Sequence, residues 1–370
     1  MRKTVALFLS GCVISMTAAS TALADANITV DAATGEILSQ EDAFQRWYPA
    51  SLTKLMTVYV AFRMIKSGQV TLDTPIRITA LSAKQPPSKM GYKAGSELTL
   101  DNALKIMMVK SANDVAMAVG ETLGGSSDKF AGLMNAEAKR LGMTGSHFVN
   151  PNGLHSDDHY TTARDLAILT LHLRREFPEY AHYFDIEAID YGGKKLQPNL
   201  NALIGRFQGA DGMKTGFVCP SGYNLIGSAT RNGRTIITVV LGELKLATRA
   251  TKAAELLAKG FETKGSGTTI DALQPYGAPT RDVAVNMRQS VCSKESGSDT
   301  WDGKDLEGHI VQGSPYMNRM DREPAAEKVA LLPTKVNSLG IDLNRIPVPV
   351  PRPERSSLTD ASATRLKALN

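Results

Sequence analysis

The chain of 370 residues lacks several features that would place it in a specialised class of proteins. It has three cysteines, six histidines without metal-ligand spacing, and no internal repeat. Its formal charge of +5 is too small to indicate a nucleic-acid partner. These absences favour an ordinary globular protein without a metal or cofactor, with one large domain and something smaller.

Long apolar runs are also scarce, and the first one fits a signal peptide rather than a membrane span. Arg2 and Lys3 form a basic start, an apolar core occupies residues 5–18, and Ala22-Leu23-Ala24 provides a cleavage site. We therefore expect a signal peptide at residues 1–24 and export to the periplasm or another extracytoplasmic compartment. Removing the two basic residues lowers the formal charge to 5 − 2 = +3.

The three cysteines leave two questions open. Cys12 ends a Leu-Ser-Gly-Cys sequence that resembles a lipoprotein cleavage box, which is the competing interpretation of the N-terminus. Cys219 and Cys292 remain after cleavage. In an oxidising compartment they either pair, tying the distal segment to the main domain, or stay as two buried thiols.

The hydrophobic pattern predicts a mixed α/β (α+β) fold. Residues 55–65 are apolar nearly all round, which indicates a buried helix that begins near Pro49. Two β-branched runs, 224–230 and 235–241, flank Asn232-Gly233 and predict a hairpin. The order of strands, helices, strands and helix predicts an antiparallel sheet flanked by helices, plus a helical subdomain. Further elements are expected as strands at 28–30 and 36–38 and helices at 102–109, 115–123, 129–141, 166–173 and 247–259.

We expect residues 25–262 to form the main domain. Residues 263–300 are predicted to be a connecting segment, with a short β-module between 272 and 330 as the alternative. Residues 301–370 contain a proline-rich stretch and are predicted to be a largely disordered tail. The end of this tail has too few apolar residues for a clear membrane anchor.

Ser51 and Lys54 are the first candidate catalytic pair. They lie three residues apart at the predicted start of the buried helix, so their side chains share one face. A serine hydroxyl there is close to free backbone N–H groups, and a partly desolvated lysine can act as its base. The competing interpretation is a helix cap beside a solvated lysine. A second Ser-x-x-Lys, from Ser126 to Lys129, lies in a glycine-rich loop and is interpreted as a chance match.

Two further motifs follow in the order expected of one kind of active site. Ser111-Ala112-Asn113 and Lys214-Thr215-Gly216 are each weak alone, since they also suit a helix junction and a turn. With Ser51-Leu52-Thr53-Lys54 they resemble the motifs of penicillin-binding proteins and serine β-lactamases. The wider sequence resembles the D-alanyl-D-alanine carboxypeptidases of the low-molecular-mass penicillin-binding family, over roughly residues 26–262. The matching stretches are 49–57, 111–114, 141–143, 159–165, 209–216 and 239–242.

The resemblance implies a role for each motif residue. Ser51 would be acylated by the carbonyl between two D-alanines, Lys54 would accept its proton, and Ser111 would pass a proton to the leaving amine. The other residues would bind substrate. Asn113 would hold the substrate's amide, and Lys214 and Thr215 would bind its terminal carboxylate. Gly216 would let its strand approach the substrate backbone closely. Phe217 would supply an oxyanion-hole N–H together with that of Ser51, and Arg249 would lie near the carboxylate.

These roles imply an exported serine carboxypeptidase that trims peptidoglycan stem peptides ending in D-Ala-D-Ala and is inhibited by β-lactams. A D,D-endopeptidase acting on cross-links is the enzyme alternative, and a non-catalytic cell-wall scaffold is the other. Ala112 replaces a glycine of many relatives, a small change. Residues 177–198 contain no Glu-x-x-x-Asn arrangement of the kind a β-lactamase uses for deacylation. His159 and Tyr160 are interpreted as structural.

Overall fold

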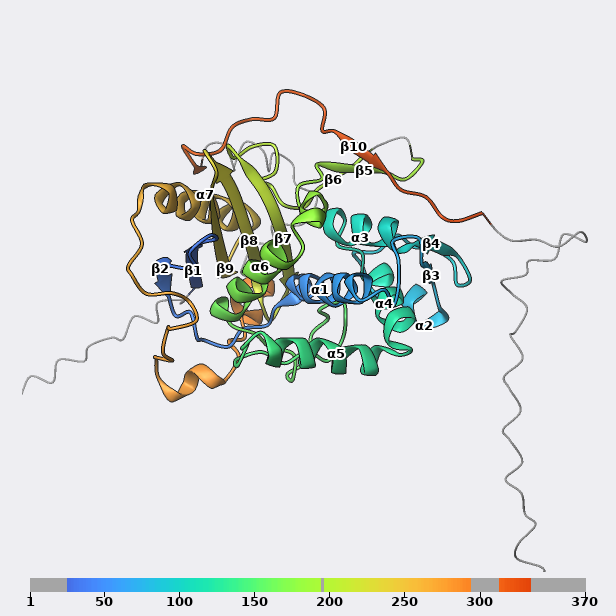
Figure 1. Ribbon diagram of the computed structural model, residues 1–370, viewed down its shortest axis with the longest axis horizontal. Coiled ribbons are helices and arrows are strands. Elements are labelled where there is room, and N and C mark those ends of the chain that lie inside the picture. Colours follow the sequence, from blue (N-terminus) through green and yellow to red (C-terminus); the bar gives the residue numbers. More distant parts are fainter. Residues whose placement is uncertain (1–24, 194–195, 294–312, 334–370) are drawn as a thin grey trace, which may run out of the picture.

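The computed structural model describes residues 25–193, 196–293 and 313–333, which form a sheet with covering helices and a helical lobe beside it (Figure 1). The sheet has five strands in the order β2-β1-β9-β8-β7, and each neighbouring pair is antiparallel. Strands from the two ends of the domain therefore meet through β1 and β9, which confirms the predicted sheet. The strands are β1 (Ala26–Asp31), β2 (Ile37–Glu41), β7 (Ala210–Val218), β8 (Gly222–Arg231) and β9 (Arg234–Glu243).

The two faces of the sheet bury different side chains because successive residues of a strand point to opposite sides. On β8 and β9, Leu225 and Val240 pack with the apolar face of α7 (Leu246–Glu262). Ile226 and Val239 instead belong to the larger core, which includes α6 (Ala163–Glu176). Each face is thus covered by helices, and edge strand β7 faces the helical lobe (Figure 1).

Helix α1 (Thr53–Lys66) runs through the middle of the helical lobe. Its residues 53–62 are all buried, as the apolar pattern predicts. A short 3₁₀ turn, η1 (Ala50–Leu52), leads into it, so the prediction of a helix beginning near Pro49 is confirmed. The surrounding elements are β3 (Pro75–Arg77), α2 (Ala80–Ala83), β4 (Glu97–Thr99), α3 (Leu100–Val109), α4 (Asn113–Gly124), α5 (Ser127–Arg140) and η2 (Pro178–Tyr183).

Cys219 and Cys292 form a disulfide with a Cα–Cα distance of 5.7 Å, which decides between the two alternatives for these residues. It joins the end of β7 to α8 (Arg288–Cys292), the last element before residue 293. Between α7 and α8 the chain contains one 3₁₀ turn, η3 (Pro279–Asp282). The connecting segment is therefore fastened to the main domain at the rim of the sheet.

Part of the expected tail is structured, so the prediction of a largely disordered segment from residue 301 is wrong for residues 313–333. Here β10 (Ala326–Lys328) pairs in parallel with β5 (Ala188–Asp190), which also pairs with β6 (Gln197–Pro198). Lys105 on α3 forms an ion pair with Glu327 at 2.8 Å. The strand thus extends a small sheet of the main domain and does not build the separate β-module considered above.

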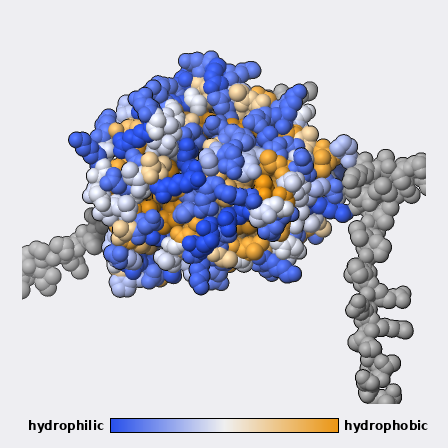
Figure 2. All heavy atoms as spheres, in the orientation of Figure 1, coloured by the Kyte–Doolittle hydropathy of each residue, from blue (hydrophilic) through white to orange (hydrophobic). Residues whose placement is uncertain are grey.

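Two predictions concern parts of the chain outside the described residues: the signal peptide at 1–24 and the tail at 301–312 and 334–370. Apolar side chains on the displayed surface are interspersed with polar ones (Figure 2). Large exposed ones such as Leu81, Leu133 and Val283 lie in separate parts of the chain, on α2, on α5 and directly after η3. Among the described helices, none combines the length and the apolar character that crossing a membrane requires.

Candidate active site

Ser51 lies in η1, directly before the buried helix α1. Ala50 has a φ of +48°, and the Leu52 N–H donates to the Pro49 carbonyl oxygen at 3.2 Å, which forms a tight turn. Ser51 is half-buried and lines a cavity. The turn therefore presents a hydroxyl to the cavity at the N-terminal end of a helix, where the helix dipole favours negative charge.

Lys54 is fully buried, and its amine contacts three oxygen atoms. Its Nζ lies 2.9 Å from Ser51 Oγ, 2.8 Å from Asn113 Oδ1 and 2.7 Å from the carbonyl oxygen of Asn152. Burial and the neighbouring positive charge of Lys214 hold the pKa of Lys54 well below its usual value, although Asp114 opposes this shift. The predicted serine–lysine pair is therefore in hydrogen-bonding contact.

Ser111 and Asn113 flank the junction between α3 and α4. Ser111 has a φ of +62° and lines the same cavity as Ser51. The Asn113 amide donates to the carbonyl oxygens of Pro86 and Pro87 at 3.0 and 3.2 Å. These bonds orient Oδ1 toward Lys54, so in this structure Asn113 is a partner of the lysine. Binding of a substrate amide by Asn113 stays a prediction.

Strand β7 carries Lys214, Thr215, Gly216 and Phe217 along the opposite side of the cavity. A Cβ atom on Gly216 would lie 2.9 Å from the carbonyl oxygen of Pro49 and 3.1 Å from the amide nitrogen of Ser51. Only a residue without a side chain lets the strand pack this closely against the serine turn. Gly216 thus allows β7 to pack against η1, while its predicted close approach to a substrate backbone stays a prediction.

Lys214 is 1% exposed and donates to the carbonyl oxygen of Thr215 at 3.1 Å. Burial, with a further contribution from the charge of Arg249, lowers the pKa of Lys214 to about 7. Its amine thus lies behind the surface of the cavity, whereas Thr215 lines it.

Arg249 reaches the cavity from α7, and its predicted place near a substrate carboxylate stays a prediction. It is 3% exposed, its guanidinium contacts the Tyr223 ring, and it donates to the Asn224 carbonyl oxygen at 3.4 Å. Its Nε is buried without a hydrogen-bond partner. Burial lowers the pKa of Arg249 to about 10, an unfavourable setting for a cation without an anion beside it.

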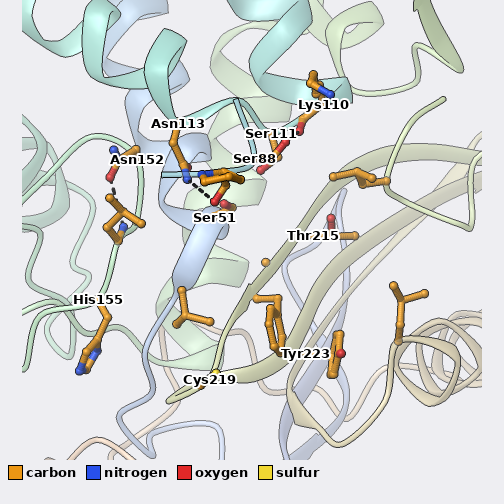
Figure 3. A pocket seen from close by; sticks show the side chains of 18 of the residues that line it. Ser51, Ser88, Lys110, Ser111, Asn113, Asn152, His155, Thr215, Cys219 and Tyr223 are labelled. Atoms are coloured by element: carbon orange, nitrogen blue, oxygen red, sulfur yellow. Dashed lines mark hydrogen bonds between the residues drawn. The ribbon is translucent and has the colours of Figure 1, made fainter. Parts of the chain in front are cut away.

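These elements enclose a cavity of about 730 Å³ (Figure 3). Figure 3 shows Ser51, Ser111 and Asn113 together, with Thr215 across the cavity. Among the described residues that line it there is no aspartate or glutamate, but Lys110, Arg249 and Arg288 are present. The cavity therefore suits a ligand with negative charge.

The sequence does not predict three residues that build this site. Asn152 supplies a carbonyl oxygen to Lys54, and its side chain donates to Gln85 at 2.9 Å. Gly153 has a φ of +83°, and a Cβ there would lie 1.8 Å from the carbonyl oxygen of Ala50. Asn224 fastens the chain before Ser51 to the sheet through the carbonyl oxygen of Tyr48 at 3.0 Å. The sequence Asn150-Pro151-Asn152-Gly153 is typical of a turn, and this is the signal that could have pointed to the first two.

Two other residues that the sequence offers as candidates for catalysis, His159 and Ser126, lie outside the cavity. His159 is buried, its Nε2 lies 2.8 Å from Thr53 Oγ1, and burial lowers its pKa to about 3. It packs behind the serine turn and does not line the cavity. Ser126 caps α5 by accepting the Lys129 N–H at 3.1 Å, which supports its interpretation as a chance match. Within the described ranges, no group of three or more His, Cys, Asp or Glu side chains could hold a metal ion.

An antiparallel sheet beside a helical lobe, with a serine–lysine pair at the start of the central helix, defines the fold of the penicillin-binding proteins. The chain belongs to peptidase family S11, the D-alanyl-D-alanine carboxypeptidases, whose sequence profile matches residues 14–245. The family that the motifs predict is thereby confirmed.

Individual relatives agree with this assignment. The chain is 35% identical over 242 residues to D-alanyl-D-alanine carboxypeptidase DacC of Escherichia coli, covering 63% of this chain and 60% of DacC. Penicillin-binding protein 5 of Haemophilus influenzae superposes with a TM-score of 0.61 at 31% identity, over 65% of this chain and 71% of that one. Penicillin-binding protein D2 of Listeria monocytogenes, in a cefotaxime-bound form, superposes with a TM-score of 0.59 at 29% identity, over 65% of this chain and 97% of that one. The chain thus spans about 60% of the length of DacC.

Proposed function

We propose that residues 25–262 form a serine D,D-carboxypeptidase that removes the terminal D-alanine from peptidoglycan stem peptides. The observation that carries the proposal is the 2.9 Å contact between Ser51 Oγ and the fully buried amine of Lys54. A serine hydroxyl is a weak nucleophile until a base accepts its proton. A buried lysine whose pKa is well below normal can be that base at neutral pH.

The hydrogen bonds of Lys54 suit this role. A neutral amine has two N–H donors and one lone pair. The two oxygen acceptors at Asn113 and Asn152 use both donors, so the lone pair is left for the Ser51 hydroxyl. In the proposed first step, this lone pair takes the proton while Ser51 Oγ bonds to the carbonyl carbon between the two D-alanines.

The negative oxygen formed in this step needs hydrogen-bond donors. The backbone N–H groups of Ser51 and Phe217 are the proposed pair, and their support is the packing of β7 against η1 at Gly216. Collapse of the intermediate breaks the C–N bond, and Ser111 relays a proton to the departing amine. Water then attacks the acyl-enzyme and releases the shortened peptide.

The terminal carboxylate of the substrate would occupy the side of the cavity that holds Thr215 and Arg249. The unpartnered Nε of Arg249 and the lowered pKa of Lys214 support this placement. A carboxylate there would accept hydrogen bonds from Thr215 and stabilise both cations.

We also propose that β-lactams acylate Ser51 and are released slowly. The described lining of the cavity offers no aspartate or glutamate that could activate water against a bulky acyl group. The Cys219–Cys292 disulfide supports export, because such bonds persist in oxidising compartments.

Labelling with a fluorescent penicillin, followed by mass spectrometry of the adduct, tests the nucleophile. The mature protein should carry one stable adduct on Ser51, and folded Ser51→Ala should carry none. Ser126→Ala, in the other Ser-x-x-Lys sequence, is the matched control and should label like the wild type. An adduct that persists in Ser51→Ala refutes the assignment.

The product then identifies the reaction. Incubation with a stem pentapeptide ending in D-Ala-D-Ala should release free D-alanine, measured with D-amino-acid oxidase. Release of muropeptides from cross-linked dimers without free D-alanine would identify an endopeptidase instead.

A further inference from the structure

One residue that lines the cavity, Arg288, comes from outside residues 25–262, the domain that carries the three motifs. The disulfide links Cys219, just after β7, to Cys292 at the end of α8. At the other end of α8 the Met287 N–H donates to the carbonyl oxygen of Pro220 at 2.9 Å. Both ends of this five-residue helix are thus fixed to the turn between β7 and β8.

Arg288, the first residue of α8, lines the cavity with an exposed side chain. The other two cations of the lining have different surroundings. Arg249 is buried beside Tyr223, and Lys110 donates to Gln197 Oε1 at 2.9 Å on the helical side. With no carboxylate among the described lining residues, Arg288 supplies positive charge to the cavity at the Cys219–Pro220 end.

The direction of the substrate places this end on the acyl side of the scissile bond. Strand β7 is a sheet edge, and an extended peptide can lie along such an edge. With the terminal carboxylate at Thr215 and Arg249, the lining continues along the strand and the turn after it through residues 217–220. At about 3.3 Å per residue, the third residue from the C-terminus would reach the part of the chain to which α8 is fastened, at Cys219 and Pro220.

We propose that Arg288 is a specificity residue that binds a side-chain carboxylate on the residue preceding the two D-alanines. This inference rests on the proposed function and deepens it by naming the substrate class. A guanidinium can bind a carboxylate through two parallel hydrogen bonds. The disulfide holds α8 beside the turn after β7, so the backbone that carries Arg288 is in place before substrate arrives.

The test compares kcat/KM for N-acetyl-L-Glu-D-Ala-D-Ala and its neutral isostere N-acetyl-L-Gln-D-Ala-D-Ala. The wild type should prefer the glutamate peptide by about three- to tenfold, the range of one well-placed charge-assisted contact. Arg288→Gln should remove the preference by slowing only the glutamate peptide. Arg319→Gln is the matched control, because it removes an exposed arginine that does not line the cavity, and it should keep the preference.

Each other outcome separates the two proposals. An unchanged preference in Arg288→Gln, or an equal loss for both peptides, overturns the role of Arg288 while leaving the carboxypeptidase intact. Failure of the wild type to release D-alanine from either peptide overturns the proposed function and this inference with it.

A second variant tests the tether without changing any charge. Cys292→Ser should retain turnover of the glutamine peptide and lose the preference for glutamate, because α8 then loses its covalent link to the turn after β7. Retention of the full preference would show that the disulfide does not position Arg288.

Discussion

Each of the two walls of the cavity contains a fully buried lysine, and the two lysines have very different surroundings. On the helical wall, the Lys54 amine has three oxygen partners within 2.9 Å. On the sheet wall, the Lys214 amine donates to one backbone carbonyl at 3.1 Å, and Arg249 nearby has an unpartnered Nε. Burial lowers the pKa of both lysines.

The difference shows which wall has its hydrogen-bond partners in place without substrate. A neutral Lys54 has a partner for each N–H and for its lone pair, so the helical wall is already arranged to accept a proton. The sheet wall contains two buried cations with too few acceptors, which costs stability until an anion binds. In the free protein, the buried lysine of the helical wall thus has all its hydrogen-bond partners, whereas the cations of the sheet wall lack an anionic partner among the described residues.

The largest expected effect is that of Lys54→Met. Without the base, acylation of Ser51 should slow by about 10²- to 10⁴-fold. The variant should also unfold more easily by about 1–3 kcal/mol, because Asn113 Oδ1 and the Asn152 carbonyl oxygen lose their buried donor. Stopped-flow acylation and urea unfolding measure the two effects. Acylation at the wild-type rate would exclude Lys54 as the base.

The matching change on the sheet wall, Lys214→Met, should have the opposite effect on stability. It removes a buried charge whose hydrogen-bond partner is the backbone carbonyl oxygen of Thr215. The melting temperature should therefore rise by a few degrees. Acylation by a peptide with a free C-terminal carboxylate should fall by about 10- to 100-fold. Equal destabilisation of the two methionine variants would contradict the contrast between the walls.

The stability gained in Lys214→Met should depend on pH. The pKa of Lys214 is about 7 in the folded protein, below the value of about 10.4 expected in the unfolded chain. Below pH 7 the folded state must bury a charged amine, whereas between these values the folded amine is neutral and stability rises with pH. The advantage of Lys214→Met should therefore be largest at or below pH 7 and fade toward pH 10, as measured by thermal unfolding.

Local patterns were sufficient to predict the parts of this molecule that depend on neighbouring residues. The all-round apolar run at 55–65 and the Asn232-Gly233 hairpin each encode an element within a few residues, and both are found. The motif residues Ser51 and Lys54 meet because one helical turn separates them.

The remaining parts depend on contacts between distant segments, which a local pattern does not contain. Asn152 reaches Lys54 across 98 residues, and Cys219 pairs with Cys292 across 73. Strand β10 has three residues, too few for an alternating pattern to stand out, and its pairing with β5 spans well over a hundred residues.

The smallest expected effect is that of Gly216→Ala, at the point where β7 of the sheet wall packs against the Ser51 turn. In Gly216→Ala the new methyl group would press on two backbone atoms, the Pro49 oxygen and the Ser51 nitrogen, which cannot rotate away. We expect about 1–3 kcal/mol of destabilisation and about a tenfold slower acylation, because the Ser51 turn must shift relative to β7. Gly132→Ala is the control, since a Cβ there meets nothing within 4 Å inside helix α5, and it should slightly stabilise the protein. Slower acylation with unchanged penicillin adduct stability would mean that the contact between walls matters for forming the acyl-enzyme and not for its breakdown.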